Sequence, residues 1–178
     1  MSAAFFCAEA YIVFVLQQRW DLGAGTAGLA LTGVGIAWAA ASHVQSRIGD
    51  RLSHATVIRL GSALLLAGTA ALALVVWAHL HFALAMATYV VAGIGMGLGY
   101  PRTGVAMLAA STDADRGFNS SALSVADSLG AALALSFSGI VFTVATRVDV
   151  LPFLPVYALA TLLAGLAAVT AARTGSTY

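Results

Sequence analysis

The sequence has little charge and no lysine. Of its 178 residues only 8% are Asp, Glu, Lys or Arg, and its eight basic residues are arginines spread singly along the chain. A soluble domain carries roughly a quarter charged residues, so this chain has too little polar surface to cover a globule in water. It also has no basic patch that could hold phosphate groups. These absences exclude a cytosolic enzyme, a disordered chain and a nucleic-acid binder.

Cysteine is almost absent, and so are metal-ligand patterns. The single cysteine, Cys7, lies in an apolar run and supports neither a disulfide framework nor a thiolate metal site. The four histidines lack the spacing of metal ligands, and no Ser/His/Asp arrangement stands in a plausible hydrolytic context. We therefore expect no enzymatic activity, no cofactor and no metal site.

What the sequence does contain is long apolar runs, and 61% of its residues are hydrophobic. A helix needs roughly 20 apolar residues to cross a bilayer core about 30 Å thick. Backbone groups in lipid must be satisfied internally, which favours helices, and the runs are about twice too long for barrel strands. The sequence predicts an all-α integral membrane protein, with one domain over 1–178 and the lipid bilayer as its first partner. Its six expected spans cover residues 2–18, 26–46, 56–78, 82–109, 118–146 and 152–172.

The arginines are divided unequally between the two ends of the expected bundle. Cytoplasmic loops of membrane proteins carry an excess of Lys and Arg. Arg19 and Arg147 lie at one end, and the other end carries Arg47, Arg51, Arg59, Arg102, Arg116 and Arg173. We expect a multi-pass protein of the plasma (inner) membrane, with both termini in the cytoplasm.

Small residues form two patterns typical of close helix packing. Residues 93–99 read GIGMGLG, with two overlapping G-x-x-x-G pairs. Because these glycines cover more than one helix face, we expect the fourth span to pack against two neighbours, with a kink at Pro101. In the second span, a face of small and weakly polar residues favours another packing seam. Its members are Gly28, Thr32, Gly35, Ala39, Ser42 and Ser46.

Two carboxylates lie inside expected spans, Glu9 in the first and Asp127 in the fifth. A charged acid at the bilayer centre costs about 2.5–3.5 kcal/mol on insertion scales, so each should face the bundle interior or a cavity, where it could exchange a proton. The alternative is an acid that pairs with an interfacial arginine or lies shallower in the membrane. Arg102 is expected either to snorkel to the interface or to pair with Asp113 or Asp115.

The helix face that carries Asp127 is rich in serine, and Ser124 and Ser128 belong to it. A serine-lined face with a carboxylate is typical of a helix that borders a water-filled cavity. In the alternative interpretation, each serine donates a hydrogen bond to a carbonyl of its own helix.

Four stretches of the chain resemble one family of membrane proteins. Residues 49–54 read GDRLSH, and their Asp-Arg pair matches the core of the cytoplasmic loop motif of major facilitator superfamily transporters. Residues 8–11, 95–101 and 115–123 read AEAY, GMGLGYP and DRGFNSSAL, and are similar to the seventh helix, the tenth helix and the start of the eleventh in multidrug-efflux-like members. In this order and spacing, they make the chain resemble the C-terminal six-helix half of such a transporter.

The resemblance implies a central cavity bordered by the first, second, fourth and fifth spans. It assigns proton or cationic-substrate binding to Glu9 and Asp127, the cavity lining to Tyr11, Ser124 and Ser128, and the cytoplasmic gate to Asp50 and Arg51. A complete member has two six-helix halves, with its sites at their interface.

The expected function is therefore that of the C-terminal half of a secondary active efflux transporter for a small molecule or drug, with the proton as its coupling ion. The expected partners are the unknown small-molecule substrate and either an N-terminal half or a second copy of the chain. The alternative is a membrane fragment that does not transport, or an interaction or structural partner of another half.

Overall fold

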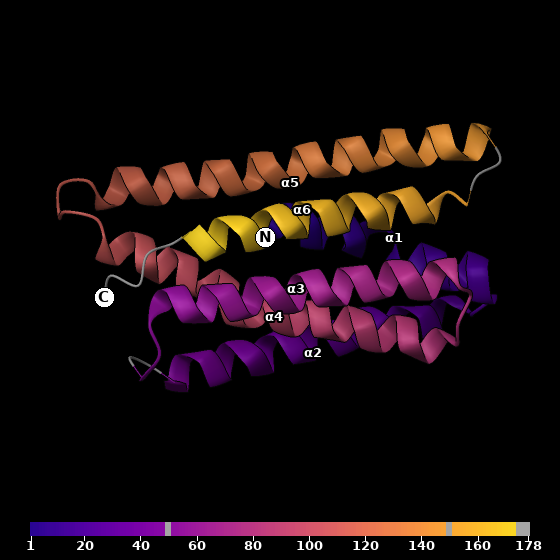
Figure 1. Cartoon of the computed structure of the whole chain (residues 1–178), viewed down its shortest axis with the longest axis horizontal. Helices are drawn as coiled ribbons and strands as arrows, with labels where there is room; N and C mark the ends of the chain where they lie inside the picture. Colours follow the sequence, from indigo (N-terminus) through magenta and orange to yellow (C-terminus); the bar gives the residue numbers. More distant parts are fainter. Residues whose placement is uncertain (49–50, 149–150, 174–178) are drawn as a thin grey trace.

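The computed structural model describes residues 1–48, 51–148 and 151–173, and this part of the chain is helical without strands. Long α-helices lie side by side in it (Figure 1). Their bounds are α1 Ser2–Trp20, α2 Ala24–Ile48, α3 His54–Trp77, α4 Phe82–Ala109, α5 Arg116–Arg147 and α6 Phe153–Arg173. The predicted all-α bundle of six helices is confirmed, and each helix begins and ends within two residues of its expected span.

Local sequence explains several of the helix ends. Ser53 caps α3, because its hydroxyl oxygen accepts a hydrogen bond from the backbone N–H of Thr56 at 3.2 Å. His81 caps α4 in the same way, accepting at Nδ1 from the backbone N–H of Ala83 at 3.2 Å. At the end of α1, Asp21 adopts a left-handed backbone with φ 53°, which turns the chain toward α2.

Five of the six helices, α2 to α6, are long and apolar enough to cross a membrane. They indicate a multi-pass membrane protein. The first helix, α1, is as long as a span but more polar, because it carries Glu9 and ends in the polar run 17–19. Instead of relying on its own hydropathy, α1 is covered by protein: it packs against each of the other five helices.

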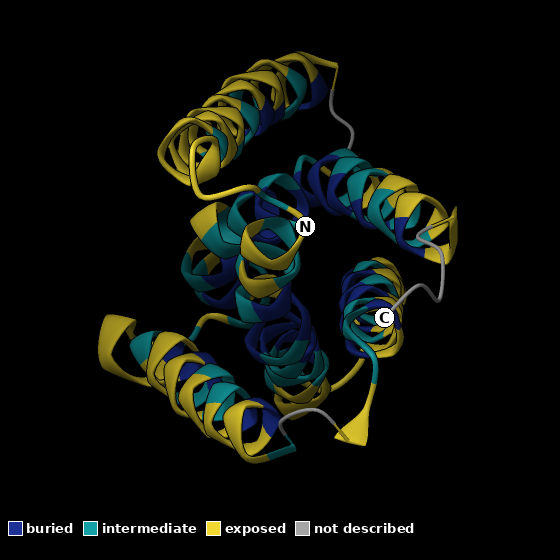
Figure 2. Ribbon diagram, turned by 90° about the vertical axis from the view of Figure 1, so that its left-hand side faces the viewer, coloured by how far each residue is buried: buried dark blue, intermediate teal, exposed yellow. Residues whose placement is uncertain are grey.

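The other helices are arranged around α1. In Figure 2, α5 and α2 stand at the top and bottom of one side, with α1 and α4 between them, and α3 and α6 form the opposite side. We call the first of these the α2–α5 side and the second the α3–α6 side. The α2–α5 side is thus formed by the four helices that the resemblance assigns to a central cavity.

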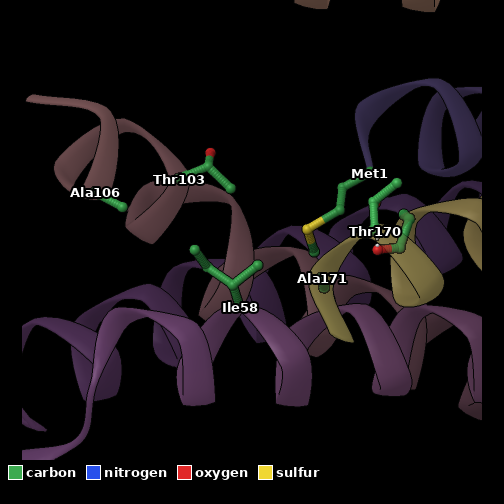
Figure 3. A pocket seen from close by; sticks show the side chains of 7 residues that line it. Met1, Ile58, Thr103, Ala106, Thr170 and Ala171 are labelled. Carbon is green, nitrogen blue, oxygen red and sulfur yellow. Dashed lines mark hydrogen bonds between the residues drawn. The ribbon is translucent and has the colours of Figure 1, made fainter. Parts of the chain in front are cut away.

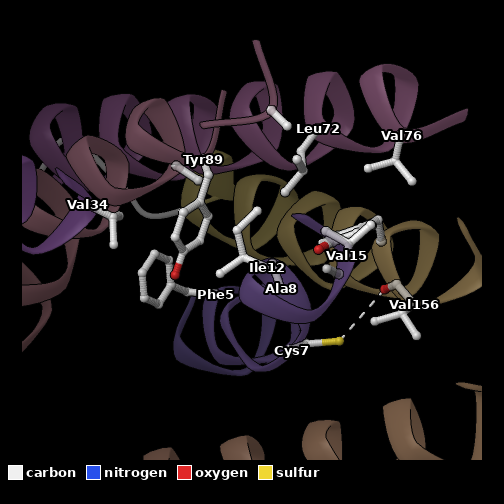
Figure 4. Packing of buried hydrophobic residues seen from close by; sticks show 14 of the residues in the cluster. Phe5, Cys7, Ala8, Ile12, Val15, Val34, Leu72, Val76, Tyr89 and Val156 are labelled. Atoms are coloured by element: carbon white, nitrogen blue, oxygen red, sulfur yellow. Dashed lines mark hydrogen bonds between the residues drawn. The ribbon is translucent and has the colours of Figure 1, made fainter. Parts of the chain in front are cut away.

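The apolar core gathers along α1 (Figure 4). Phe5 and Ile12 of α1 are fully buried, in one cluster with Leu72 of α3 and Tyr89 of α4. The Phe5 ring stacks on that of Tyr89 with 5.7 Å between the centroids. Within lipid, close van der Waals packing of this kind holds helices together, because lipid tails are as apolar as the side chains.

The glycines of α4 divide between two neighbouring helices, as the sequence predicts. A Cβ atom added to Gly95 would lie 2.5 Å from the backbone nitrogen of Leu65 in α3. One added to Gly97 would collide with the Trp38 carbonyl group in α2. Glycine is therefore required for both close contacts. Beyond them, α4 continues through Pro101 and turns toward the start of α5 (Figure 1).

The packing seam predicted for α2 is wrong for most of its members. Thr32, Gly35, Ala39 and Ser46 are exposed, and only Ser42 reaches α4, where its hydroxyl donates to the Gly97 carbonyl at 3.1 Å. The face that packs instead carries Ala27, Ala30, Val34 and Ala41. Val34 and Ala41 fit against Gly93 and Gly97, so the apolar side chains that face the glycines of α4 form the contact. The small-residue face of α2 is left open.

Candidate functional site

A hydrogen bond joins α4 to α5 on the α2–α5 side. The hydroxyl group of Tyr100 donates to Oδ2 of Asp127 over 2.9 Å. The Tyr100 ring also meets the edge of Trp38 from α2, with 6.2 Å between the centroids and an interplanar angle of 71°. We call Trp38, Tyr100 and Asp127 the acidic–aromatic site. It joins three side chains in a row, in which Trp38 of α2 contacts Tyr100 of α4, and Tyr100 bonds to the half-buried carboxylate of Asp127 on α5.

The glycine packing of α4 positions this site. Gly97 lets the backbone of α2 approach at Trp38, and Tyr100 follows Gly97 by one helical turn on the same face. The indole of Trp38 therefore reaches the Tyr100 ring. On its other side Trp38 meets Phe5 of α1 edge to face, with 5.1 Å between the centroids. The acidic–aromatic site is thus continuous with the aromatic part of the core.

Glu9 lies apart from Asp127. Its carboxyl group is half-buried and close enough to interact electrostatically with Tyr89 of α4. The Tyr89 hydroxyl is buried and has no hydrogen-bond partner in the described part of the chain. Gly130 of α5 faces Ala3 of α1 and Gly139 faces Tyr11, so Asp127 lies level with the start of α1 and about 12 Å along the bundle from Glu9. The structure does not bring the two predicted acids into one cluster.

Neither acid pairs with an arginine of the described residues, which removes the ion-paired alternative for both. For Asp127 the observed partner is the neutral hydroxyl of Tyr100. A carboxylate held by a neutral donor keeps its charge available to a proton or a cation.

Tyr11 also lies apart from Asp127. Its ring contacts Phe142 of α5, with 5.2 Å between the centroids, and its hydroxyl lies beside Gly139. Gly139 is about 18 Å further along α5 than Asp127. Tyr11 therefore helps to pack α1 on α5 in the described structure.

Ser124 and Ser128 are exposed on α5 beside Asp127, and their predicted role as cavity lining stays a prediction. They line an open depression of about 430 Å³. The Ser124 hydroxyl donates to the Ser120 carbonyl at 3.0 Å, and Ser121 and Ser136 bond to their own helix in the same way. The alternative, a serine bonded to its own helix, is therefore found for Ser124, whereas no such bond is found for Ser128 in the described part of the chain. The hydroxyl oxygens can still accept hydrogen bonds from water or a ligand.

The two predicted gate residues fall in the connection between α2 and α3. Asp50 lies outside the described residues. Arg51 is exposed just before α3, and no contact of its side chain is found within the described part of the chain.

Both predictions for Arg102 are wrong. Its side chain is 4% exposed, and Nη1 lies 3.2 Å from Nδ1 of His54 at the start of α3. Asp113 instead pairs with Arg116 at 3.1 Å, and Asp115 accepts a hydrogen bond from Thr112. The reason is helical spacing: Arg102 follows the α3-facing glycines 95 and 99 on the same face, and so points into α3.

A further pocket of about 390 Å³ lies between α3, α4 and α6 (Figure 3). Ile58, Thr103 and Thr170 contribute to its lining, together with Met1. Both threonine hydroxyls donate to carbonyls of their own helices. None of its lining side chains is ionisable, so this pocket offers packing space without the chemistry of the acidic–aromatic site.

The sequence prediction missed Tyr100 and Trp38, although one signal for Tyr100 was present. α4 and α5 are antiparallel neighbours joined by a short connection, so residues equally far from that connection lie at the same depth. Tyr100 is about 14 Å before the end of α4, and Asp127 about 17 Å after the start of α5. Trp38 had no such signal, because its helix is not adjacent to α4 in the chain.

No protein-family model matches the chain, and no curated protein matches it. Among the described residues, no group of three or more His, Cys, Asp or Glu side chains could hold a metal ion.

Proposed function

We propose that this chain forms one half of a secondary active membrane transporter that exchanges protons for a small molecule, most simply an efflux transporter of the major facilitator type. The observation that carries the proposal is the half-buried Asp127 carboxylate, bonded to Tyr100 between apolar helices. An acid inside a membrane helix is costly and marks ion or proton pathways. Its position on the largely exposed helix α5, facing Tyr100 of α4, supports a role at the surface where two halves would meet.

The exchange would take place at one carboxyl group. Ionised Asp127 attracts a cation, while the Tyr100 hydroxyl donates a hydrogen bond to the carboxylate and the Tyr100 ring, which contacts Trp38, presents an aromatic face nearby. Protonation removes the charge, and so releases the cation. Competition of proton and cation for Asp127 would couple their movement in opposite directions.

The exposure of α5 supports the need for a second half. Of its 32 residues, only Ala134, Ser138 and Ala145 are buried. Five of its serines, Ser120, Ser121, Ser124, Ser128 and Ser136, are exposed, and so are most members of the small-residue face of α2. Lipid tails cannot form hydrogen bonds with such polar faces, whereas a partner half would cover them and enclose a path for the substrate.

A structural or interaction partner without transport is the second candidate function, and the same exposed helix favours it. The two candidate functions differ in whether proton movement across the membrane depends on Asp127. A purely structural partner would form a complex, and yet proton movement would not depend on Asp127.

The test is proton movement into proteoliposomes that contain the full chain, alone and with any co-expressed partner half, followed with an enclosed pH-sensitive dye. Asp127→Asn should abolish coupled proton movement while leaving membrane insertion intact. Asp113→Asn is the matched control, because Asp113 is an exposed loop acid paired with Arg116. If the Asp127 variant moved protons as the wild type does, the proposal would fail.

A further inference from the structure

An apolar groove runs along the α3–α6 side, away from the acidic–aromatic site. It has a volume of about 840 Å³. Leu66 of α3 forms one wall, and α6 forms the other with Leu162, Gly165, Leu166 and Ala172 among its lining residues. Gly165 opens the groove, because a Cβ atom there would come no closer than 4.0 Å to the Leu66 side chain. Leu162 and Leu166 beside it are 68% and 63% exposed.

The length of the groove matches one leaflet of a membrane. Its lining on α6 extends from Thr161 to Ala172, which is about 16 Å of helix. Half of a bilayer core is about 15 Å thick. The one hydroxyl in the lining, that of Thr161, donates to the Tyr157 carbonyl of its own helix. The groove therefore presents a hydrocarbon surface the length of a single acyl chain.

Two arginines stand at one end of this groove. Arg59 of α3 donates from Nε to the Ala171 carbonyl and from Nη2 to the Ala172 carbonyl, each at 3.1 Å. Ala172 also lines the groove, so the Arg59 guanidinium lies directly at its end. Arg173 follows in the chain, and both arginines are exposed. Positive charge is thus concentrated where the headgroup of a lipid in the groove would lie.

We infer that this groove binds an anionic phospholipid, with one acyl chain along α6 and the phosphate group beside Arg59 and Arg173. The apolar groove holds the acyl chain along its length, and the two guanidinium groups attract the phosphate headgroup. In the orientation that the arginine distribution predicts, this end faces the cytoplasmic leaflet, where anionic lipids concentrate. The inference depends on membrane insertion of α3 and α6, and is independent of transport.

The test is native mass spectrometry of the full chain released from micelles that contain equal amounts of dioleoyl phosphatidylglycerol and dioleoyl phosphatidylcholine. The two lipids have the same acyl chains, so only the headgroup differs. The wild type should retain phosphatidylglycerol preferentially. Arg173→Gln should lower that retention about fivefold and leave phosphatidylcholine unchanged. Arg147→Gln, which removes an exposed arginine at the other end of the bundle, should have no effect.

A second pair of variants tests the groove itself. Gly165→Leu should fill it and lower retention of both lipids, whereas Gly104→Leu adds the same side chain to open space on α4 and should not. Circular dichroism of each variant checks that the helices persist. A substitution of Arg59 would be less informative than one of Arg173, because Arg59 also holds the end of α6 through its hydrogen bonds. Equal retention of the two lipids by the wild type would overturn the inference. So would unchanged retention in Gly165→Leu, or displacement of the lipid by glycerol phosphate alone.

Discussion

The Tyr100 hydroxyl lies 2.9 Å from Oδ2 of Asp127, and this contact connects the glycine-packed helix α4 to the largely exposed helix α5. The tyrosine is fixed by the tight part of the bundle, while the aspartate belongs to the helix with the fewest buried residues. A change in the charge of the Asp127 carboxylate therefore acts directly on the contact between α4 and α5.

Removal of the Tyr100 hydroxyl should weaken transport much more than it weakens the fold. A hydrogen bond to a charged group contributes about 1.5–3 kcal/mol, so Tyr100→Phe should slow proton-coupled transport about tenfold or more. The ring contact with Trp38 is kept in phenylalanine and the lost hydrogen bond is exposed, so the thermal unfolding midpoint in detergent should fall only slightly, much less than for Gly97→Val. Initial rates in proteoliposomes measure the first effect. An unchanged rate would show that the hydroxyl has no part in the exchange.

The exposed serine face of α5 should be accessible to water in the membrane. Ser128→Cys should react quickly with a membrane-impermeant maleimide, because the thiolate forms only where water reaches it. Leu162→Cys on the α3–α6 side is the matched control, and should react slowly because it faces lipid. The native Cys7 is buried and should not contribute. Equal labelling of the two variants would contradict the assignment of the α2–α5 side to a water-filled path.

The close contact of α4 with α2 should tolerate no side chain larger than glycine. Gly97→Val would drive a branched side chain into the Trp38 carbonyl and the Ala41 methyl group. Overpacking of this kind destabilises by about 1–3 kcal/mol, and here it would also separate Trp38 from Tyr100. Gly104→Val is the control, because nothing lies within 4 Å of a Cβ atom there. Thermal unfolding in detergent should show a clear drop for the first variant only; similar midpoints would argue against the packing described.

The fold was predictable from the sequence because two signals agree along most of the chain. Apolar length set the helices, and polar clusters set the connections between them, so every helix end falls close to its expected position. The alternate glycines of α4 also predicted two packing partners correctly. Glycine spacing is informative because backbones can approach closely only where side chains are missing.

Which neighbour each face contacts was harder to predict. The small-residue face of α2 has the composition of a packing seam, but Val34 and Ala41 on another face fit the notches left by Gly93 and Gly97. The residue pattern of one helix does not specify the surface shape of the helix that packs against it. Arg102 was misjudged for the same reason, since its burial depends on His54 of α3.

The candidate site was predicted in part. Asp127, Ser124 and Ser128 lie together on α5, because residues three and four apart share one helix face. Tyr11 and Glu9 lie apart from them. The two helices are in contact along much of their length, and a family resemblance does not say which residue of α1 lies level with which residue of α5. Tyr100 was missed although its distance from the α4–α5 connection matches that of Asp127, and Trp38 was missed because its contact with Tyr100 arises from the packing of α2 on α4.

The most direct measurement is proton release from the solubilised protein when a lipophilic cation is added in weak buffer. Tetraphenylphosphonium is a suitable probe, since it carries charge and aromatic surface together. If Asp127 exchanges a proton for a cation, the wild type should release protons on addition of the probe, whereas Asp127→Asn should release none and Asp113→Asn should behave as the wild type. Equal release from the wild type and Asp127→Asn, or no release from the wild type, would contradict the account.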